Sequence, residues 1–191
     1  MSRLILASGS PRRVQLLREA RFEPEVLPAQ VEELWCNFFT PSELTLFNAF
    51  QKAVAVAIKC PDAVVLGADT LVALGSEVFG KPRDFDEARR MLEKLVGKTH
   101  DVITGVALVH ANIGRIITRA VHTAVKFRPL SANEINAYLR IAEPLDKAGA
   151  YAAQASPELI IERIDGSFTN VVGLPMEVVH PLLASAGIYP V

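Results

Sequence analysis

An apolar segment in the first half of the chain constrains the fold most. Residues 63–68 read AVVLGA, and the polar Asp69 follows directly. A strand with one face in water alternates apolar and polar residues, whereas a strand covered on both faces is apolar throughout. Residues 63–68 are therefore predicted to form a strand that is buried on both faces, with Asp69 at its end.

Strand and helix signals alternate along the rest of the chain. Further strands are expected at residues 4–7, 70–74, 77–81, 102–109, 115–127 and 159–164. Helix starts are expected at Ser10-Pro11, at capping boxes of Thr40 with Glu43 and of Ser131 with Glu134, at Asp84, and at Pro175. Two neighbouring strand pairs look like hairpins, which a fully parallel sheet does not contain. The pattern therefore predicts an α/β fold with a mixed, extended sheet flanked by helices.

The composition fits one globular domain over residues 1–191. Half of the residues are hydrophobic, 21% are charged, and the formal net charge is −1. Without a basic field, no nucleic-acid partner is expected, and a small phosphorylated substrate is favoured. The apolar stretches are far shorter than the ~20 residues that span a bilayer, so no membrane partner is expected. Cys36 and Cys60 show no metal-ligand spacing, which fits a reducing, cytoplasmic setting.

The segment SGSPRR at residues 8–13 joins the first expected strand to the first expected helix. Free backbone N–H groups at a helix start favour an anion. Ser8, Ser10, Arg12 and Arg13 would add hydroxyl and guanidinium donors that suit phosphate oxygens. The same pattern also fits a serine N-cap followed by two solvated arginines. The segment alone does not decide between these two interpretations.

Asp69 and Lys81 become neighbours if the Gly-Ser pair between the two hairpin strands forms a two-residue turn. Leu74 then pairs with Glu77, and counting back along both strands sets Thr70 opposite Lys81. A carboxylate beside an ammonium is either an exposed ion pair of little value or part of a metal and phosphate site. Both interpretations remain open from the pattern alone.

Three other side chains are weaker candidates. Glu33 is the second of two adjacent glutamates in an expected loop. A carboxylate at this position, close to Asp69, would let the two acids hold one divalent cation together with bridging phosphates. Acids in loops are usually only solvated, so this second interpretation remains open. Lys52 shares a helix face with Lys59, which is typical of a solvated face. The Gln154 amide both donates and accepts hydrogen bonds, which suits the edge of a pyrimidine base.

Five motifs follow one another along nearly the whole chain. They are ASGSPRR at residues 7–13, GADT at 67–70, GKP at 80–82, KAGAY at 147–151 with Gln154 shortly after, and VGLP at 172–175. In this order and spacing they resemble the Maf family. The resemblance implies a fold related to the inosine triphosphate pyrophosphatases, with two lobes around a cleft, and often a homodimer. It also implies cleavage of nucleoside triphosphates between the α and β phosphates with a divalent cation, Mg²⁺ or Mn²⁺.

The resemblance also implies a role for each matched residue. Asp69 would be the catalytic base and, with Glu33, a metal ligand. Phosphate would be bound by Arg12, Arg13 and Lys81, with Ser8, Ser10 and Lys52 completing the polar shell. Arg12, Thr70 and Gln154 resemble the type that acts on dTTP and UTP, which implies a pyrimidine nucleotide as substrate, modified ones included, in a house-cleaning role. The alternative is a nucleotide-sensing regulator of cell division or septum formation, which would need the arginines but not Asp69.

Overall fold

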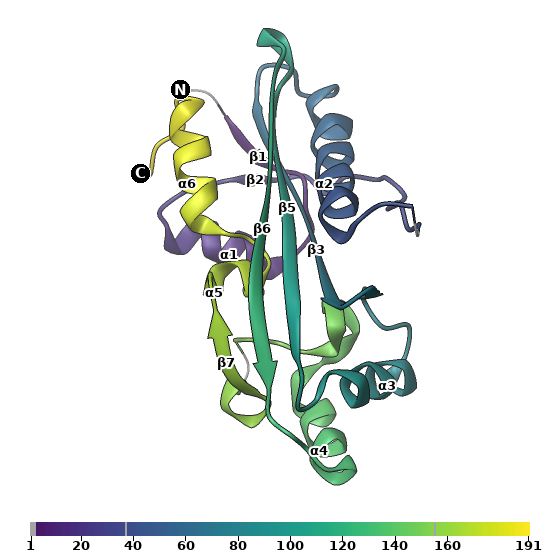
Figure 1. The fold of residues 1–191 in the computed structure, drawn as a ribbon. Coiled ribbons are helices and arrows are strands. Elements are labelled where there is room, and N and C mark those ends of the chain that lie inside the picture. Colours follow the sequence, from purple (N-terminus) through teal and green to yellow (C-terminus); the bar gives the residue numbers. More distant parts are fainter. Residues whose placement is uncertain (1–2, 37, 155) are drawn as a thin grey trace. The chain divides into compact units, whose positions relative to one another are not determined.

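The structure, a computed structural model, describes residues 3–36, 38–154 and 156–191. Within those residues seven strands form one sheet in the order β2-β1-β3-β5-β6-β7, and β4 pairs with β3 (Figure 1). The pairs β1–β2 and β1–β3 are parallel, whereas β3–β4 and β6–β7 are antiparallel. The strands are β1 (Leu4–Leu6), β2 (Glu25–Val26), β3 (Val64–Leu74), β4 (Glu77–Phe79), β5 (Thr99–His110), β6 (Arg115–Phe127) and β7 (Ile161–Asp165). The predicted α/β fold with a mixed sheet is confirmed.

The helices begin close to the predicted cap residues. They are α1 (Pro11–Glu19), α2 (Pro41–Ala57), α3 (Phe85–Leu95), α4 (Ala132–Ala142), α5 (Phe168–Val172) and α6 (Met176–Ser185), with short 3-10 turns at Ala111–Ile113, Pro144–Asp146, Ala148–Ala150 and Pro157–Leu159. Both capping boxes form, because Thr40 and Ser131 each exchange hydrogen bonds with the glutamate three residues on. Among the described residues, no helix combines the length and the apolar character needed to cross a membrane.

The central strand differs from the prediction in a way that matters for Asp69. Strand β3 runs without a break from Val64 to Leu74, so the prediction that a strand ends at residue 68 is wrong. The apolar pattern resumes after Asp69, because Leu71 and Val72 are buried in turn. A buried polar side chain with partners does not end a strand, so Asp69 lies in the middle of β3.

The hairpin after β3 is confirmed at its turn and wrong at its far end. Leu74 pairs with Glu77 as predicted, with Gly75 at a φ of 61° in the turn. Strand β4 then ends at Phe79, and the carbonyl oxygen of Gly80 accepts a hydrogen bond from the N–H of Gly149 at 3.1 Å. The predicted strand partnership of Thr70 and Lys81 is therefore wrong, because the backbone leaves the ladder before residue 81.

Three smaller differences occur in the second half and at the ends of the chain. Strand β7 begins at Ile161, because Pro157–Leu159 forms a 3-10 turn where the strand was expected to start. Pro175 precedes α6 as its N-cap residue instead of opening it. Strand β2 and helix α5, with two and five residues, were not predicted, since so few residues carry no periodicity.

The chain divides into two compact units. The first contains Met1–Asp69, Thr104–Val121 and Gly173–Val191, and the second contains Thr70–Ile103 and His122–Val172. Strands β3, β5 and β6 contribute residues to both units. Asp69 is the last residue of its segment in the first unit, and Thr70 is the first residue of the second.

In the first unit, helix α2 lies against strands β3 and β5 (Figure 1) because each strand presents a glycine to it. A Cβ atom at Gly67 would lie 2.2 Å from the carbonyl oxygen of Ala49, and one at Gly105 would lie 2.3 Å from that of Thr45. No side chain fits at such a distance, so the helix backbone rests directly on the strands. This contact fixes the position of α2 over the centre of β3.

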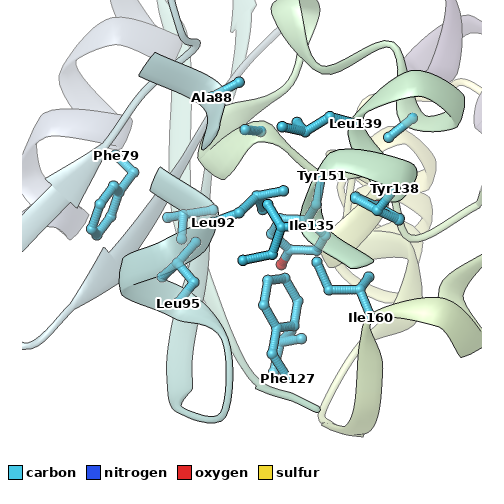
Figure 2. Close-up of a cluster of buried hydrophobic side chains, with 14 of the residues drawn as sticks. Phe79, Ala88, Leu92, Leu95, Phe127, Ile135, Tyr138, Leu139, Tyr151 and Ile160 are labelled. Carbon is cyan, nitrogen blue, oxygen red and sulfur yellow. The ribbon is translucent and has the colours of Figure 1, made fainter. Parts of the chain in front are cut away.

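In the second unit, helices α3 and α4 pack against each other around an aromatic side chain. Figure 2 shows Leu92 and Leu95 of α3 and Ile135 of α4 gathered around Tyr151, and all four are buried. Full burial of a leucine or isoleucine side chain contributes about 1.5–3 kcal/mol. The segment that follows Tyr151 and leads to Gln154 therefore begins from a firmly packed residue.

Candidate functional site

Asp69 is a buried carboxylate with two partners on helix α2. It is 5% exposed, in the middle of β3. Its Oδ1 lies 2.7 Å from the Nζ of Lys52, and its Oδ2 accepts a hydrogen bond from the Nδ2 of Asn48 at 3.3 Å. A buried carboxylate is costly unless it is paired and hydrogen-bonded, and here both oxygens have partners. A side chain that is buried at such a cost on a strand centre is a candidate for function.

Lys52 links two carboxylates. Its Nζ lies 2.6 Å from the Oε1 of Glu33 in addition to the 2.7 Å contact with Asp69. The Lys52 side chain is 12% exposed, whereas that of Glu33 is 50% exposed. The helix-face argument indicated a solvated lysine, and the structure shows that this is wrong for Lys52, because it points to the strand. The family resemblance, not the spacing, identified this residue.

Asn48 was missed by the sequence analysis. It is 2% exposed, and its amide holds the backbone of Leu34 from both sides. Its Oδ1 accepts from the Leu34 N–H at 2.8 Å, and its Nδ2 donates to the Leu34 carbonyl at 3.1 Å. The signal that was available is its position four residues before Lys52, since residues at that spacing share a helix face. Asn48 thus fixes the loop that carries Glu33 beside Asp69.

The loop from β1 to α1 is held by Arg13, which is buried. Its guanidinium donates to the Ser8 hydroxyl at 2.9 Å, to the Ala68 carbonyl at 2.9 Å and to the Gly173 carbonyl at 2.8 Å. Burial lowers the pKa of Arg13, and the nearby Asp69 opposes that change. Arg13 therefore joins the first loop to the residue that precedes Asp69. The interpretation of Arg13 as a solvated arginine is wrong.

Ser8, Ser10 and Arg12 complete this loop. The Ser8 hydroxyl also accepts a hydrogen bond from the Ser10 N–H at 3.3 Å. Ser10 occupies the N-cap position of α1, but its side chain makes no capping hydrogen bond. Arg12 and Ser10 are both half-buried at the first turn of the helix. Backbone N–H groups at a helix start and these polar side chains are the features that favour an anion.

The remaining predicted residues belong to the second unit. Thr70 follows Asp69 on β3 and is half-buried. Lys81 is exposed beyond the end of β4. Gln154 is exposed and follows the buried residues 151–153, where the Ala152 N–H donates to the Tyr138 hydroxyl at 3.1 Å. Asp69, Lys52, Glu33, Ser8 and Arg13 are thus brought together within the first unit.

The arrangement of Glu33 and Asp69 fits a divalent cation that is shared with a phosphate ligand. In the part of the chain that the structure describes, no group of three or more His, Cys, Asp or Glu residues could form a complete protein site for a metal. Mg²⁺ commonly binds through one or two carboxylates together with water and substrate phosphates. Glu33 and Asp69 already converge on one cation, the Lys52 ammonium, so their oxygens can serve a metal ion in the same place.

The site combines a buried acid on an α/β sheet with a lysine and a loop of the phosphate-binding type. This combination defines a candidate enzyme that acts on phosphorylated substrates. The chain belongs to the family described as "Maf-like protein", whose profile matches residues 3–186.

Several relatives are similar over nearly their whole length. A dTTP/UTP pyrophosphatase from Geobacter metallireducens is 46% identical over 182 residues, which is 95% of each chain. A protein of the same name from Symbiobacterium thermophilum is 44% identical over 191 residues, covering 100% of this chain and 97% of the other. One from Bacillus cereus strain G9842 is 44% identical over 176 residues, covering 92% and 91%.

A solved structure of a HAM1 protein from Coxiella burnetii is more distantly similar. It is 15% identical, with a TM-score of 0.42, and the match covers 65% of this chain and 71% of the other.

Proposed function

We propose that this chain is a metal-dependent nucleoside triphosphate pyrophosphatase that converts dTTP and UTP to the monophosphate and pyrophosphate. The relatives that bear the name dTTP/UTP pyrophosphatase support the substrate class, at 44–46% identity. The observation that carries the proposal is the buried Asp69, whose carboxylate is held by Lys52 beside Glu33. A hydrolase of this kind needs such an acid next to groups that donate hydrogen bonds to phosphate oxygens.

In the proposed reaction, Asp69 acts on the attacking water. The water oxygen forms a bond to the α phosphorus, the bond from that phosphorus to the bridging oxygen breaks, and pyrophosphate leaves. The water proton passes to an Asp69 oxygen, so charge and atoms balance. Its hydrogen bond from the Asn48 amide keeps the carboxylate oriented. A bound Mg²⁺ or Mn²⁺, held by Glu33 and Asp69, would neutralise phosphate charge.

Phosphate binding is proposed for Ser10, Arg12, Lys52 and Lys81, which would offset the charge that develops on the leaving pyrophosphate. Arg13 has a different proposed role. Its internal hydrogen bonds support a part in positioning, because they hold the Ser8 loop to the carbonyl of the residue before Asp69. The backbone N–H groups of the loop would then face the phosphates as a rigid unit.

Measuring pyrophosphate release tests the proposal. Purified protein is incubated with UTP, with and without Mg²⁺ or Mn²⁺, and the products are separated by chromatography. Monophosphate and pyrophosphate in equal amounts, formed only with a metal, are expected. Release of orthophosphate instead, or nucleotide binding without any cleavage, contradicts the proposal. The second of these results would favour a nucleotide sensor.

Pyrimidine selection is proposed for Arg12, Thr70 and Gln154. A site that hydrogen-bonds a base edge discriminates strongly against a base that leaves those groups unpaired. Turnover of dTTP and UTP is therefore expected to exceed that of CTP and GTP, and Gln154→Ala is expected to reduce the difference. Gln15→Ala is the matched control, because Gln15 is exposed on α1 and its amide donates to the carboxylate of Glu19 on the same helix. A preference for GTP contradicts this assignment.

Two further proposals concern the setting of the enzyme. A homodimer is proposed on the basis of the family resemblance, and light scattering of the purified chain tests it against a monomer of 20.8 kDa. A cytoplasmic location is proposed because the substrate is a nucleotide and both Cys36 and Cys60 are free thiols. Fractionation of cells that express the chain tests the location.

A further inference from the structure

The Lys52 ammonium occupies the point where the carboxylates of Glu33 and Asp69 converge. It contacts the Oε1 of Glu33 at 2.6 Å and the Oδ1 of Asp69 at 2.7 Å. All three groups belong to the first unit of the chain. A divalent cation held by Glu33 and Asp69 would use these same two oxygens. The ammonium and the metal ion are therefore rivals for one position.

The backbone around this position is rigid, whereas the lysine side chain is not. Helix α2 rests on β3 through Gly67, and Asn48 holds the backbone of the Glu33 loop. The backbone segments that carry the two carboxylates thus keep their places whichever cation lies between them. Lysine has a long, flexible stem with a compact charge at its tip, so the ammonium can move to a new partner without movement of the helix.

We propose that Lys52 occupies the cation position of the nucleotide-free enzyme, and that the metal ion enters only as the polyphosphate of the substrate draws the ammonium away. The inference rests on the proposed metal-dependent function. Lys52 exchanges two carboxylates for phosphate oxygens, and the metal ion takes its place between Glu33 and Asp69. Metal and nucleotide therefore bind cooperatively, and the protein alone binds the metal weakly.

The first test measures Mn²⁺ binding without nucleotide, by electron paramagnetic resonance, in the wild type and in Lys52→Gln. The variant is expected to bind Mn²⁺ roughly tenfold more tightly, because the ion no longer displaces two ion pairs. If Lys52 only binds phosphate, or only supports the fold, no such gain in Mn²⁺ affinity is expected. Lys59→Gln is the matched control, since it removes the same charge from an exposed position just beyond α2. Equal or weaker Mn²⁺ binding in Lys52→Gln than in Lys59→Gln overturns the proposal.

Two more variants at the same position keep the test decisive. Lys52→Met retains the length of the side chain without its charge and is expected to match Lys52→Gln, so one of them suffices if the other does not fold. Lys52→Arg keeps a cation between the carboxylates and is expected to bind Mn²⁺ as weakly as the wild type does. Tight Mn²⁺ binding by Lys52→Arg contradicts the rivalry between the two cations.

The coupling between metal and nucleotide supplies a second readout. A non-hydrolysable UTP analogue with an imido group between the α and β phosphates is expected to tighten Mn²⁺ binding in the wild type more than in Lys52→Gln, and Mn²⁺ to tighten analogue binding by the same factor. An equal factor in both proteins overturns the proposal. Failure of the proposed function is distinguishable, because it appears as absent pyrophosphate release by the wild type, while the Mn²⁺ titrations require no turnover.

Discussion

A buried histidine in the second unit predicts how stability depends on pH. His100 is 2% exposed, and its Nε2 lies 3.1 Å from the hydroxyl oxygen of Tyr151. Its ring also packs edge-on against Phe127, with the ring centres 4.5 Å apart. Burial disfavours the charged imidazolium and lowers the pKa of His100 from 6.5 to about 4. The folded protein therefore keeps this side chain neutral at pH values where the unfolded chain protonates it.

The sign and size of the effect follow from linkage. Between the unfolded pKa of 6.5 and the folded pKa of about 4, the unfolded chain binds more protons than the folded one. The free energy of unfolding is thus retained above pH 6.5 and is lost as the pH falls through this window. At pH 5, the loss relative to pH 7 is about 2 kcal/mol from His100 alone.

Urea unfolding at pH 7 and pH 5 measures this loss. His100→Gln keeps a hydrogen-bonding group near Tyr151 but cannot take up a proton, so its loss on acidification is expected to be smaller than that of the wild type by about 2 kcal/mol. If wild type and His100→Gln lose the same free energy between the two pH values, the reasoning about His100 is refuted.

Three further variants test the packing and the site. Gly67→Ala places a methyl group 2.2 Å from the Ala49 carbonyl oxygen, so thermal unfolding is expected to show a loss of about 2–3 kcal/mol. In Gly9→Ala the new Cβ approaches no atom closer than 3.6 Å, and a similar loss there would contradict the packing argument. Arg13→Lys removes the forked guanidinium that donates to the carbonyl groups of Ala68 and Gly173. Chemical unfolding is expected to show a free energy of unfolding lower by about 2–4 kcal/mol, and an unchanged value would contradict its positioning role. Asn48→Leu releases the loop of Glu33, and steady-state kinetics are expected to show a roughly tenfold to hundredfold fall in kcat/KM, against no change if Asn48 is only a packing residue.

Local signals in the sequence predicted most of the secondary structure. The capping boxes at Thr40 and Ser131 place hydroxyl and carboxylate groups where the first helical N–H groups lie, so the helix starts depend on near neighbours alone. The turn after Leu74 is equally local, because Gly75 adopts the positive φ that such a turn requires. These elements were predictable because the groups that form them are adjacent in the chain.

Contacts between distant segments were not predictable in the same way. The continuation of β3 past Asp69 depends on Asn48 and Lys52, which lie 21 and 17 residues earlier and satisfy its carboxylate. Without those partners an acid at that position indicates the end of a strand. The internal bonds of Arg13 reach the Gly173 carbonyl, 160 residues away, and no pattern in the SGSPRR loop indicates that contact.

The candidate site was predicted through the family motifs more than through spacing. From its spacing, the helix face that carries Lys52 was interpreted as solvated. That spacing does not reveal that two glycines in the sheet let α2 pack onto it with this face toward Asp69. Asn48 lies outside the motifs and was missed for that reason. A helix that carries an amide and an ammonium four residues apart on the side of its buried alanines is the signal to look for in other chains.

Turnover of UTP by Asp69→Asn tests the central claim most directly. The substitution keeps the shape of the side chain but removes the base and a metal ligand, and circular dichroism checks that the fold is retained. With Asp101→Asn as the matched control at an exposed acid, pyrophosphate release by Asp69→Asn is expected to fall by roughly 10²-fold to 10⁴-fold while the control stays at the wild-type rate. Wild-type release of pyrophosphate by a folded Asp69→Asn protein would contradict the account.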